Sequence, residues 1–354
     1  MSRSGVGLAV VMVVTGMAQA HAQDAAPEPR PGLASPVRMP GMLMEGEWVP
    51  ANTTVITSED IARSGAITIQ DLLARLEGVN VLDARGFGLE SDTTVNLRGI
   101  VNGSRSTVLV LVDGVRQNRL TGDEVHWQSL PLQSIERIEV IRGGGGVIYG
   151  EGALAGVINI TTKQGGEKLL QTETGFEAGS YGWQKYHVAS RGRSHPLTYG
   201  VGFTRTLFDG YREFSKSRGS TVNAHAGVQM AEAARLNVNV LHSEDTTAFP
   251  GSLTLAQTEA RREQADISRV GIFDDETDQV AADLVVEPWE GTSGVLSVFW
   301  RDRLSDSLRS GLYTHAPSRG ASLRSTTRLD QGDASNLLVS GVELTDDKAT
   351  VGTR

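Results

Sequence analysis

The stretch IERIEVIRGGGGVIYGEGALAGVINITTK, residues 135–163, decides how the first part of this chain folds. It contains two apolar runs, residues 135–141 and 157–161, and short apolar runs bounded by glycine indicate β-strands. Between the runs, glycines permit close turns and positive φ angles at positions 143–146, 150, 152 and 156. The stretch therefore predicts two strands joined by a tightly turned connection. The first strand should alternate, with Arg137 and Glu139 on one face and Ile138 and Val140 on the other.

Two short helices are expected upstream of this stretch. Ser58 follows a predicted strand at residues 55–57 and is placed to cap the first helix. The second helix is predicted at residues 68–77 and ends at Gly78, which suits the position just past a helix C-terminus. Its apolar residues share one face at helical spacing, namely Ile69, Leu72, Leu73 and Leu76.

Further strands are expected at residues 79–82, 95–98 and 107–112. Asp113-Gly114 follows the last of them and predicts a tight turn between apolar runs. Together these elements predict a compact α+β domain over residues 52–163.

Four sequence blocks within this domain resemble the plug domain of TonB-dependent outer-membrane receptors. The blocks occur in the same order as in that family, at residues 95–99, 108–115, 135–143 and 149–163. The positions that carry the plug motif are Arg98, Gly99, Asp113, Gly114, Arg142, Gly143, Tyr149, Gly150, Gly156 and Asn159. Gly144 departs from the family, which often has proline after the Arg-Gly pair, and this loosens the expected turn.

The resemblance gives two of these residues an expected role. Arg98 and Arg142 are similar to plug arginines that pair with acidic groups on the inner wall of a barrel. The alternative is that both are solvated surface arginines, since exposed ion pairs contribute little to stability.

After Lys163 the sequence alternates with a period of two. Val222, Ala224 and Ala226, for example, alternate with Asn223 and His225. Runs of about ten residues match the length of tilted transmembrane strands. We therefore expect an antiparallel transmembrane β-barrel over residues 164–354, and a soluble β-sandwich is the alternative. Residues 191–196 are expected to form a turn, and residues 245–276 a long polar loop on the extracellular side.

The first residues have the pattern of a secretory signal peptide. Arg3 precedes an apolar segment at residues 5–14, and small residues offer cleavage after Ala22 or after Ala20. A buried helix is the alternative. Residues 1–22 are therefore predicted to be removed on export.

Residues 23–51 are predicted to be a proline-rich linker. In the family, a short peptide that TonB captures by strand addition lies at this place. Its candidate here is Met42, Leu43, Met44, Glu45 and Gly46, in which methionine replaces the usual valine. The alternative is that these five residues are plain linker.

Composition excludes several other classes of protein. A net charge of −9 argues against a nucleic-acid partner, because phosphate binding needs clustered lysine and arginine. The chain has no cysteine and therefore no thiolate metal site. Its seven histidines lack metal-binding spacing, and no catalytic arrangement is present. We expect no enzyme activity, no resident metal and no cofactor.

The resemblance implies a receptor in the outer membrane of a Gram-negative bacterium. It would contact membrane lipid and take up a scarce chelate with energy from TonB and its inner-membrane complex. A ferric siderophore is the first substrate class expected, and a vitamin-type cofactor is the alternative.

The barrel is expected to be incomplete in this chain. Plugged transporters have about 22 strands, whereas the alternation after Lys163 supports about nine. The chain also ends at Arg354 without the terminal aromatic residue of such barrels. We therefore expect a fragment or a truncated gene product, since an open half-barrel leaves unpaired edges in lipid. A remnant that does not transport, or a binding-only plug protein, is the alternative function.

Overall fold

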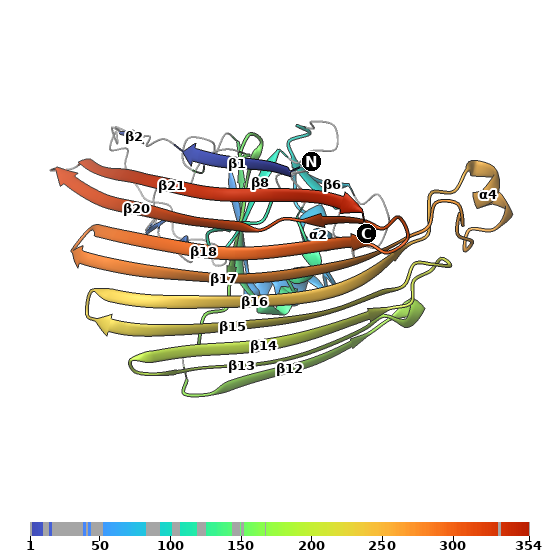
Figure 1. The fold of residues 1–354 in the computed structure, drawn as a ribbon. Coiled ribbons are helices and arrows are strands. Elements are labelled where there is room, and N and C mark those ends of the chain that lie inside the picture. Colours follow the sequence, from blue (N-terminus) through green and yellow to red (C-terminus); the bar gives the residue numbers. More distant parts are fainter. Residues whose placement is uncertain are drawn as a thin grey trace, which may run out of the picture.

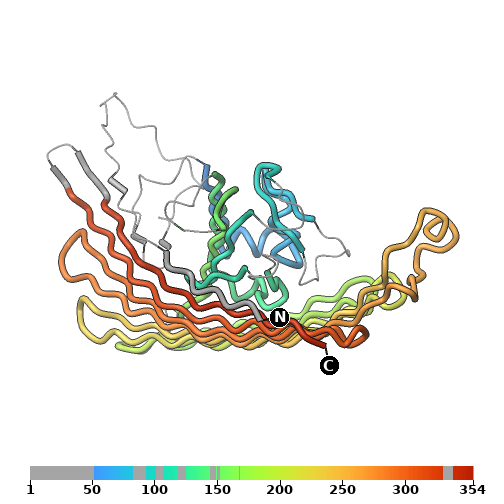
Figure 2. Tube along the Cα trace, turned by 45° about the horizontal axis from the view of Figure 1, so that its top comes forward, coloured from blue at the N-terminus to red at the C-terminus, as the bar shows by residue number. Residues whose placement is uncertain are grey.

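The structure is a computed structural model that describes two parts, a compact domain and a curved wall of long strands (Figures 1 and 2). The described residues are 52–82, 93–100, 107–118, 125–143, 149, 152–166, 168–331 and 334–353, together with short strands between residues 2 and 43. We call the compact domain the plug and the curved sheet the wall.

The plug is built on a five-stranded sheet with the order β5-β10-β11-β8-β9. β11 runs parallel to β8, and the other pairs are antiparallel. A separate pair, β6 and β7, lies beside the sheet. The bounds of the plug strands are β5 Thr53–Thr57, β6 Val79–Leu82, β7 Thr94–Leu97, β8 Val108–Val112, β9 Val115–Arg116, β10 Ile135–Arg142 and β11 Gly156–Thr162.

The plug helices are short and capped by threonine. α1 (Ser58–Ser64) has Thr57 as its N-cap, not Ser58 as predicted, because Thr57 and Asp60 form a reciprocal capping box. α2 (Ile69–Ala74) begins after Thr68, whose hydroxyl accepts from Asp71 N at 3.1 Å. It ends before Leu76, so the predicted helix over residues 68–77 was too long. Two 3₁₀ turns follow later, η1 Trp127–Ser129 and η2 Leu132–Ser134.

The plug core is apolar and closed. α2 buries Ile69, Leu72 and Leu73 against the sheet. The inner strand β10 lies between β5 and β11 and is covered on both faces, so Ile138, Glu139 and Val140 are all fully buried. The predicted alternation is confirmed, since Arg137 and Glu139 contact each other on one face and Ile138 and Val140 share the core on the other. The sequence did not reveal that both faces are covered.

The wall is an antiparallel meander in which successive strands pair from β12 to β18, after which β19 and β20 both lie between β18 and β21. Its strands are β12 Gln171–Ala178, β13 Gln184–Ser194, β14 Leu197–Phe208, β15 Ser217–Ala231, β16 Ala234–Phe249, β17 Gly271–Trp289, β18 Thr292–Ser307, β19 Leu312–His315, β20 Ser318–Gln331 and β21 Ala334–Thr353. A further 3₁₀ turn, η3 Ser180–Gly182, joins β12 to β13. The plug lies on the concave side of the wall (Figure 2).

The two faces of the wall have opposite chemistry. On β16, the outward Val240 is 43% exposed, while the inward Asn239 is only 8% exposed. The same holds across the sheet, where the exposed outward side chains are apolar: Phe176, Tyr186, Val201, Phe203, Val222, Val280, Val298 and Trp300. Exposed apolar side chains in a continuous row mark a surface that does not meet water. The wall therefore has the outward apolar, inward polar pattern of a transmembrane barrel.

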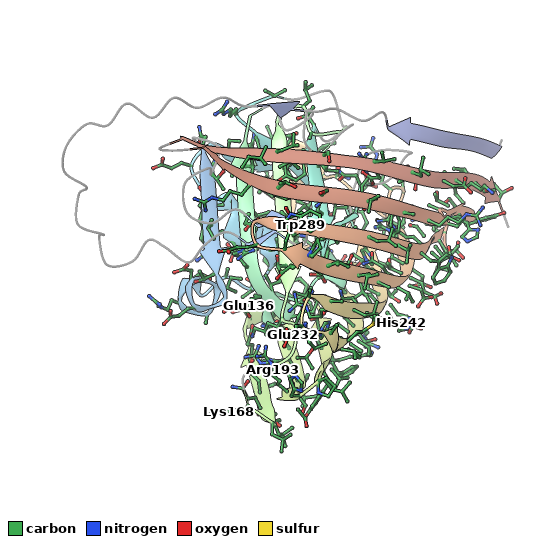
Figure 3. All side chains as sticks on the ribbon, turned by 90° about the vertical axis from the view of Figure 1, so that its left-hand side faces the viewer. Glu136, Lys168, Arg193, Glu232, His242 and Trp289 are labelled. Carbon is green, nitrogen blue, oxygen red and sulfur yellow. The ribbon has the colours of Figure 1, made fainter. Side chains whose placement is uncertain are left out.

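The two ends of the wall differ in their connections. At one end the turns are short, and only His195 and Pro196 join β13 to β14. The turn predicted at residues 191–196 is therefore shorter than expected, because residues 191–194 belong to β13. Figure 3 views this end, where Arg193, Glu232 and Trp289 are labelled. At the other end, residues 250–270 form a long connection that contains α4 (Leu255–Ala260). The predicted loop of residues 245–276 is shorter than expected, because residues 245–249 and 271–276 pair as strands.

The N-terminal strands are short. β1 (Ser2–Ala9) and β2 (Val14–Thr15) pair with β21, and both lie in residues 1–22, whose removal stays a prediction. β3 (Arg38–Met39) pairs with β4 (Met42–Leu43). Among the described residues, none of the helices is both long and apolar enough to span a membrane.

Candidate functional site: the interface between plug and wall

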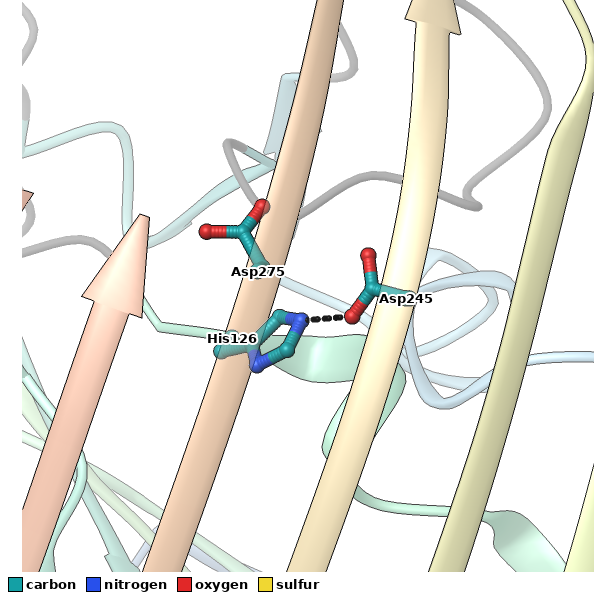
Figure 4. A group of neighbouring side chains, drawn as sticks. All are labelled: His126, Asp245 and Asp275. Carbon is teal, nitrogen blue, oxygen red and sulfur yellow. Dashed lines mark hydrogen bonds and ion pairs between the residues drawn. The ribbon is translucent and has the colours of Figure 1, made fainter. Parts of the chain in front are cut away.

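The most deeply buried polar contact between plug and wall is centred on His126. Its Nε2 bonds the carboxylate of Asp245 on β16 (Figure 4). Its Nδ1 lies 3.0 Å from Thr277 Oγ1 on β17. Asp275 of β17 completes the group, and all three ionisable residues are buried. One plug side chain thus joins two neighbouring wall strands.

Local structure fixes the position of His126. It directly precedes η1, in which Trp127 is buried and donates from Nε1 to Thr93 O at 3.0 Å. Ser129 Oγ donates to His126 O at 2.7 Å. The segment is therefore anchored in the plug before it meets the wall.

The wall residues are placed by strand register. Asp245 pairs with Asp275 across β16 and β17, so their side chains point to the same face. Like charges directly opposite destabilise a sheet, and the imidazole of His126 lies against this pair. His126, a buried residue of the plug, therefore contacts both wall strands at the point where their carboxylates face each other.

Other hydrogen bonds extend this contact over β16, β17 and β18. Gln117 Nε2 donates to Gln279 Oε1 at 3.0 Å, and Gln128 Nε2 donates to Thr247 Oγ1 at 3.3 Å. The guanidinium of Arg301 on β18 donates to the carbonyl oxygen of Arg116. We call this set of contacts the bonded face of the interface.

The His126 group also has the donors of a metal site. One imidazole and two carboxylates can each offer an atom, and these atoms lie within 4.8 Å of one another. Such a set suits zinc or iron. Both imidazole nitrogens already have protein partners, so a metal would have to displace them. The arrangement is therefore better suited to holding the plug against the wall.

A second group of this kind lies on the outer side of the wall. His242 Nδ1 is 2.8 Å from Asp278 Oδ1, and Glu276 is close by (Figure 3). These side chains are partly or fully exposed, in contrast to the His126 group.

Opposite the bonded face, the plug meets β12 to β15 through fewer contacts. Gln133 Nε2 donates to Glu177 Oε1 at 2.9 Å, and Lys163 Nζ lies 3.2 Å from Glu173 Oε2. Two cavities of about 50 Å³ and 230 Å³ lie between plug and wall here. We call this region the open face.

Plug-motif residues predicted from the sequence lie mainly inside the plug. Asp113 and Gly114 form the predicted turn with φ angles of 47° and 80°, as a type I′ turn requires. The Asp113 carboxylate also accepts from Thr162 N at 2.9 Å and Oγ1 at 2.6 Å. Burial raises the pKa of Asp113, and these hydrogen bonds oppose the rise. The turn was predictable, whereas the bond to Thr162 was not.

Arg142 makes its described contacts within the plug. Its Nε donates to Glu77 O at 3.0 Å and its Nη1 to Thr54 Oγ1 at 2.7 Å. Arg98 has a positive φ of 55° and lies beside Gly143. Over the described part of the chain, neither arginine has an acidic wall partner within ion-pair distance, so the predicted pairing stays a prediction.

The remaining motif residues surround the core. Gly156 has no room for a side chain, because a Cβ would clash with the carbonyl oxygen of Ile141. Asn159 Nδ2 donates to Glu139 Oε2 at 2.9 Å, a buried pair that the alternation pattern did not reveal. Burial raises the pKa of Tyr149. Gly99 has a positive φ of 68° after β7, and Gly150 lies outside the described residues.

The predicted TonB-binding peptide is described only in part. Met42 and Leu43 form β4, while Met44, Glu45 and Gly46 lie outside the described residues.

The long connections at one end of the wall are held together by hydrogen bonds. Arg212 donates to Gly251 O at 2.8 Å and to Gln264 O at 2.9 Å, so it ties residues 209–216 to the loop of residues 250–270. Burial lowers the pKa of Arg212. Tyr211 donates to Glu263 at 2.9 Å in the same region.

Known protein sequences are similar to part of this chain. The family model described as TonB-dependent Receptor Plug Domain matches residues 47–157. The vitamin B12 transporter BtuB of Vibrio cholerae serotype O1 is 32% identical over 190 residues, which are 54% of this chain and 30% of that protein. BtuB of Vibrio vulnificus is 35% identical over 162 residues, 46% of this chain and 25% of that protein.

Solved structures share the fold of both parts. The ferric citrate transporter FecA in its unliganded form has a TM-score of 0.72 at 20% identity, covering 86% of this chain and 49% of FecA. The ferric yersiniabactin receptor FyuA of Yersinia pestis has a TM-score of 0.70 at 17% identity, covering 86% of this chain and 50% of FyuA. The chain spans about half the length of these receptors.

Proposed function

We propose that this chain acts in TonB-dependent uptake across the outer membrane. The match of residues 47–157 to the plug domain of TonB-dependent receptors and the shared fold with part of FecA support this. The observation that carries the proposal is the pairing of an outward apolar wall with a plug that is hydrogen-bonded to its polar concave face. A plug in this place closes the barrel and has to be remodelled before a substrate can pass.

In the proposed orientation, the long connections face the cell exterior and the short turns face the periplasm. Substrate would bind at the exterior end, where residues 209–216 and 250–270 are joined by Arg212. TonB would pull on the N-terminal segment, which leads directly into β5 at the edge of the plug sheet. The site is therefore one of transport, with no chemical step on the substrate.

The first substrate class is a ferric siderophore or a similar ferric chelate. FecA and FyuA, which share the fold, are described as a ferric citrate transporter and a ferric yersiniabactin receptor. The second class is a corrinoid such as vitamin B12, and the sequence identity to BtuB favours it.

Growth of a strain that lacks the gene separates these substrates. Under iron limitation, we expect the deletion strain to lose growth on one ferric siderophore and to recover it with the gene on a plasmid. A defect only in corrinoid-dependent growth would support the second class. Normal growth on every chelate and corrinoid tested would contradict uptake as the function.

The residues that contact TonB are proposed to be Met42, Leu43, Met44, Glu45 and Gly46. Capture by strand addition needs backbone N–H groups, and proline has none. We expect Leu43→Pro to abolish uptake while substrate binding at the cell surface persists. Leu33→Pro, in the proline-rich linker, is the matched control and should keep uptake. Equal uptake by both variants would place the contact elsewhere.

A further inference from the structure

A small cavity lies on the open face, between the start of α2 and strands β13 to β15. Its volume is about 50 Å³. A buried water needs roughly 10–15 Å³ of such space, so the cavity has room for a few water-sized groups. Trp127, Leu130 and Trp183 form part of its apolar lining.

Lys185 of β13 reaches into this cavity from the wall. The residue is only 4% exposed. Its ammonium group has three protons to donate, yet its one described hydrogen bond is a long one, 3.4 Å to Ile67 O. Glu177 lies directly opposite Lys185 in the pairing of β12 and β13, and it accepts from Gln133. Among the described residues, no carboxylate lies within 4.0 Å of Lys185 Nζ.

Gln70 of α2 faces the same cavity from the plug. It is 3% exposed, and its Nε2 has no hydrogen-bond partner. An unsatisfied buried donor costs about 1–3 kcal/mol. Two donors, one of them cationic, therefore lie around one enclosed space.

The rest of the lining is uncharged, and Glu177, the residue directly opposite Lys185 in the pairing of β12 and β13, is not part of it. Lys185 is the only charged residue among those that line the cavity, and the polar remainder is hydroxyl and amide groups such as Thr68, Thr204 and Gln128. A buried charge is costly unless it is paired. The cavity thus has the sign, the donors and the size for a small anion.

We propose that this cavity binds a small monovalent anion of about the size of chloride, held by Lys185 Nζ from the wall and Gln70 Nε2 from the plug. The anion bridges plug and wall on the side where direct hydrogen bonds are few. The inference does not depend on which substrate is transported.

Bromide locates such a site directly by anomalous diffraction. We expect crystals of the whole protein grown with bromide to show an anomalous peak between Lys185 and Gln70. The Lys185→Met variant should lose the peak. A cavity that holds only water in the unchanged protein would overturn the proposal.

Thermal unfolding in detergent measures anion binding at the same site in solution. At constant ionic strength, replacing gluconate by chloride should raise the midpoint by about 2–5 °C for the unchanged protein. Lys185→Met should abolish the rise. Lys216→Met, at an exposed lysine on the outer loops, is the matched control and should keep it. A chloride response that survives in Lys185→Met would contradict the assignment.

A second variant guards against misfolding of Lys185→Met. Gln70→Leu keeps the cation and removes one donor, so it should weaken the apparent chloride affinity about tenfold. An unchanged chloride affinity in Gln70→Leu would mean that the plug does not contribute to the anion site.

Discussion

The plug and the wall use apolar residues in opposite ways. In the plug, Leu73 is fully buried at 0% exposure and belongs to an apolar core. In the wall, apolar side chains such as Val280 and Trp300 face outward, while Asp275, Thr277 and Gln279 are buried on the concave side. The plug therefore has the pattern of a protein folded in water, and the wall has the pattern of one folded in lipid.

This difference shows that alternation alone does not say which face is inside. Strands of both parts place successive side chains on opposite faces. What surrounds the strand decides where the apolar face turns: other plug elements cover β10 on both sides, whereas β16 has the plug on one side only. The interface between the two parts is accordingly polar and hydrogen-bonded.

The largest effect is expected from opening a hole in the plug core. Leu73→Ala should lower the free energy of unfolding of the plug by about 2–5 kcal/mol, because the cavity cannot fully collapse. The urea dependence of plug proteolysis measures this change in the free energy of unfolding. Leu154→Ala, at a plug residue that is 68% exposed, should change it by less than about 0.5 kcal/mol. Similar losses of unfolding free energy in the two variants would mean that the plug does not have the buried apolar core of a water-soluble protein.

A charge introduced on the outer face of the wall should lower the stability of the barrel by nearly as much. Val280→Arg is expected to destabilise the barrel by about 2–4 kcal/mol if the residue lies near the bilayer midplane. The fraction folded in lipid vesicles against urea concentration is the readout. Leu255→Arg, on the outer loop in α4, introduces the same charge away from lipid and should have little effect. If both variants fold equally well, the outward face does not meet lipid.

Breaking the bonded face should have a smaller effect. His126→Ala leaves Asp245 buried without its partner, which should cost about 1–3 kcal/mol. A double-mutant cycle with Asp245→Asn isolates the pair, and the two losses should be strongly non-additive. Gln128→Ala removes a longer contact of 3.3 Å and serves as the milder control. Additive losses at His126 and Asp245 would mean that the pair does not join plug and wall.

The smallest effect concerns pH and the buried carboxyl of the plug. Burial raises the pKa of Glu139, and its contacts with Asn159 and Arg137 oppose this rise. A raised pKa contributes stability that is fully present below the ordinary glutamate pKa and is lost as pH rises through the raised value. The plug should therefore be more stable to proteolysis in mild acid than at higher pH. Glu139→Gln should flatten this dependence, and an unchanged pH profile in that variant would exclude Glu139 as its source.

The local features of the fold were predictable from the sequence. The Asp113-Gly114 turn and the glycine at 156 follow from φ angles and space that few other residues tolerate. The period-two runs after Lys163 predicted the wall strands and placed His225 on the face opposite Val222, where it is buried. These predictions succeeded because each depends on neighbours within a few residues.

Contacts between distant segments could not be predicted in this way. His126 and Asp245 are 119 residues apart, and Asp113 and Thr162 are 49 apart. The sequence placed Asp245 at the start of a polar loop, so neither its position on β16 nor the plug residue that it meets was predicted. Lys185 and Gln70 likewise become neighbours of one cavity only when the plug is seated in the wall.

If the chain acts in uptake as proposed, the plug must move relative to the wall for substrate to pass. Since the chain has no cysteine of its own, Gln117→Cys and Gln279→Cys can be joined by a reducible thiol cross-linker across a contact of 3.0 Å. Uptake of the radiolabelled substrate by cells should stop when the two positions are joined and return when the cross-link is reduced, while each single variant transports normally. Uptake that continues with the plug joined to the wall would contradict the account.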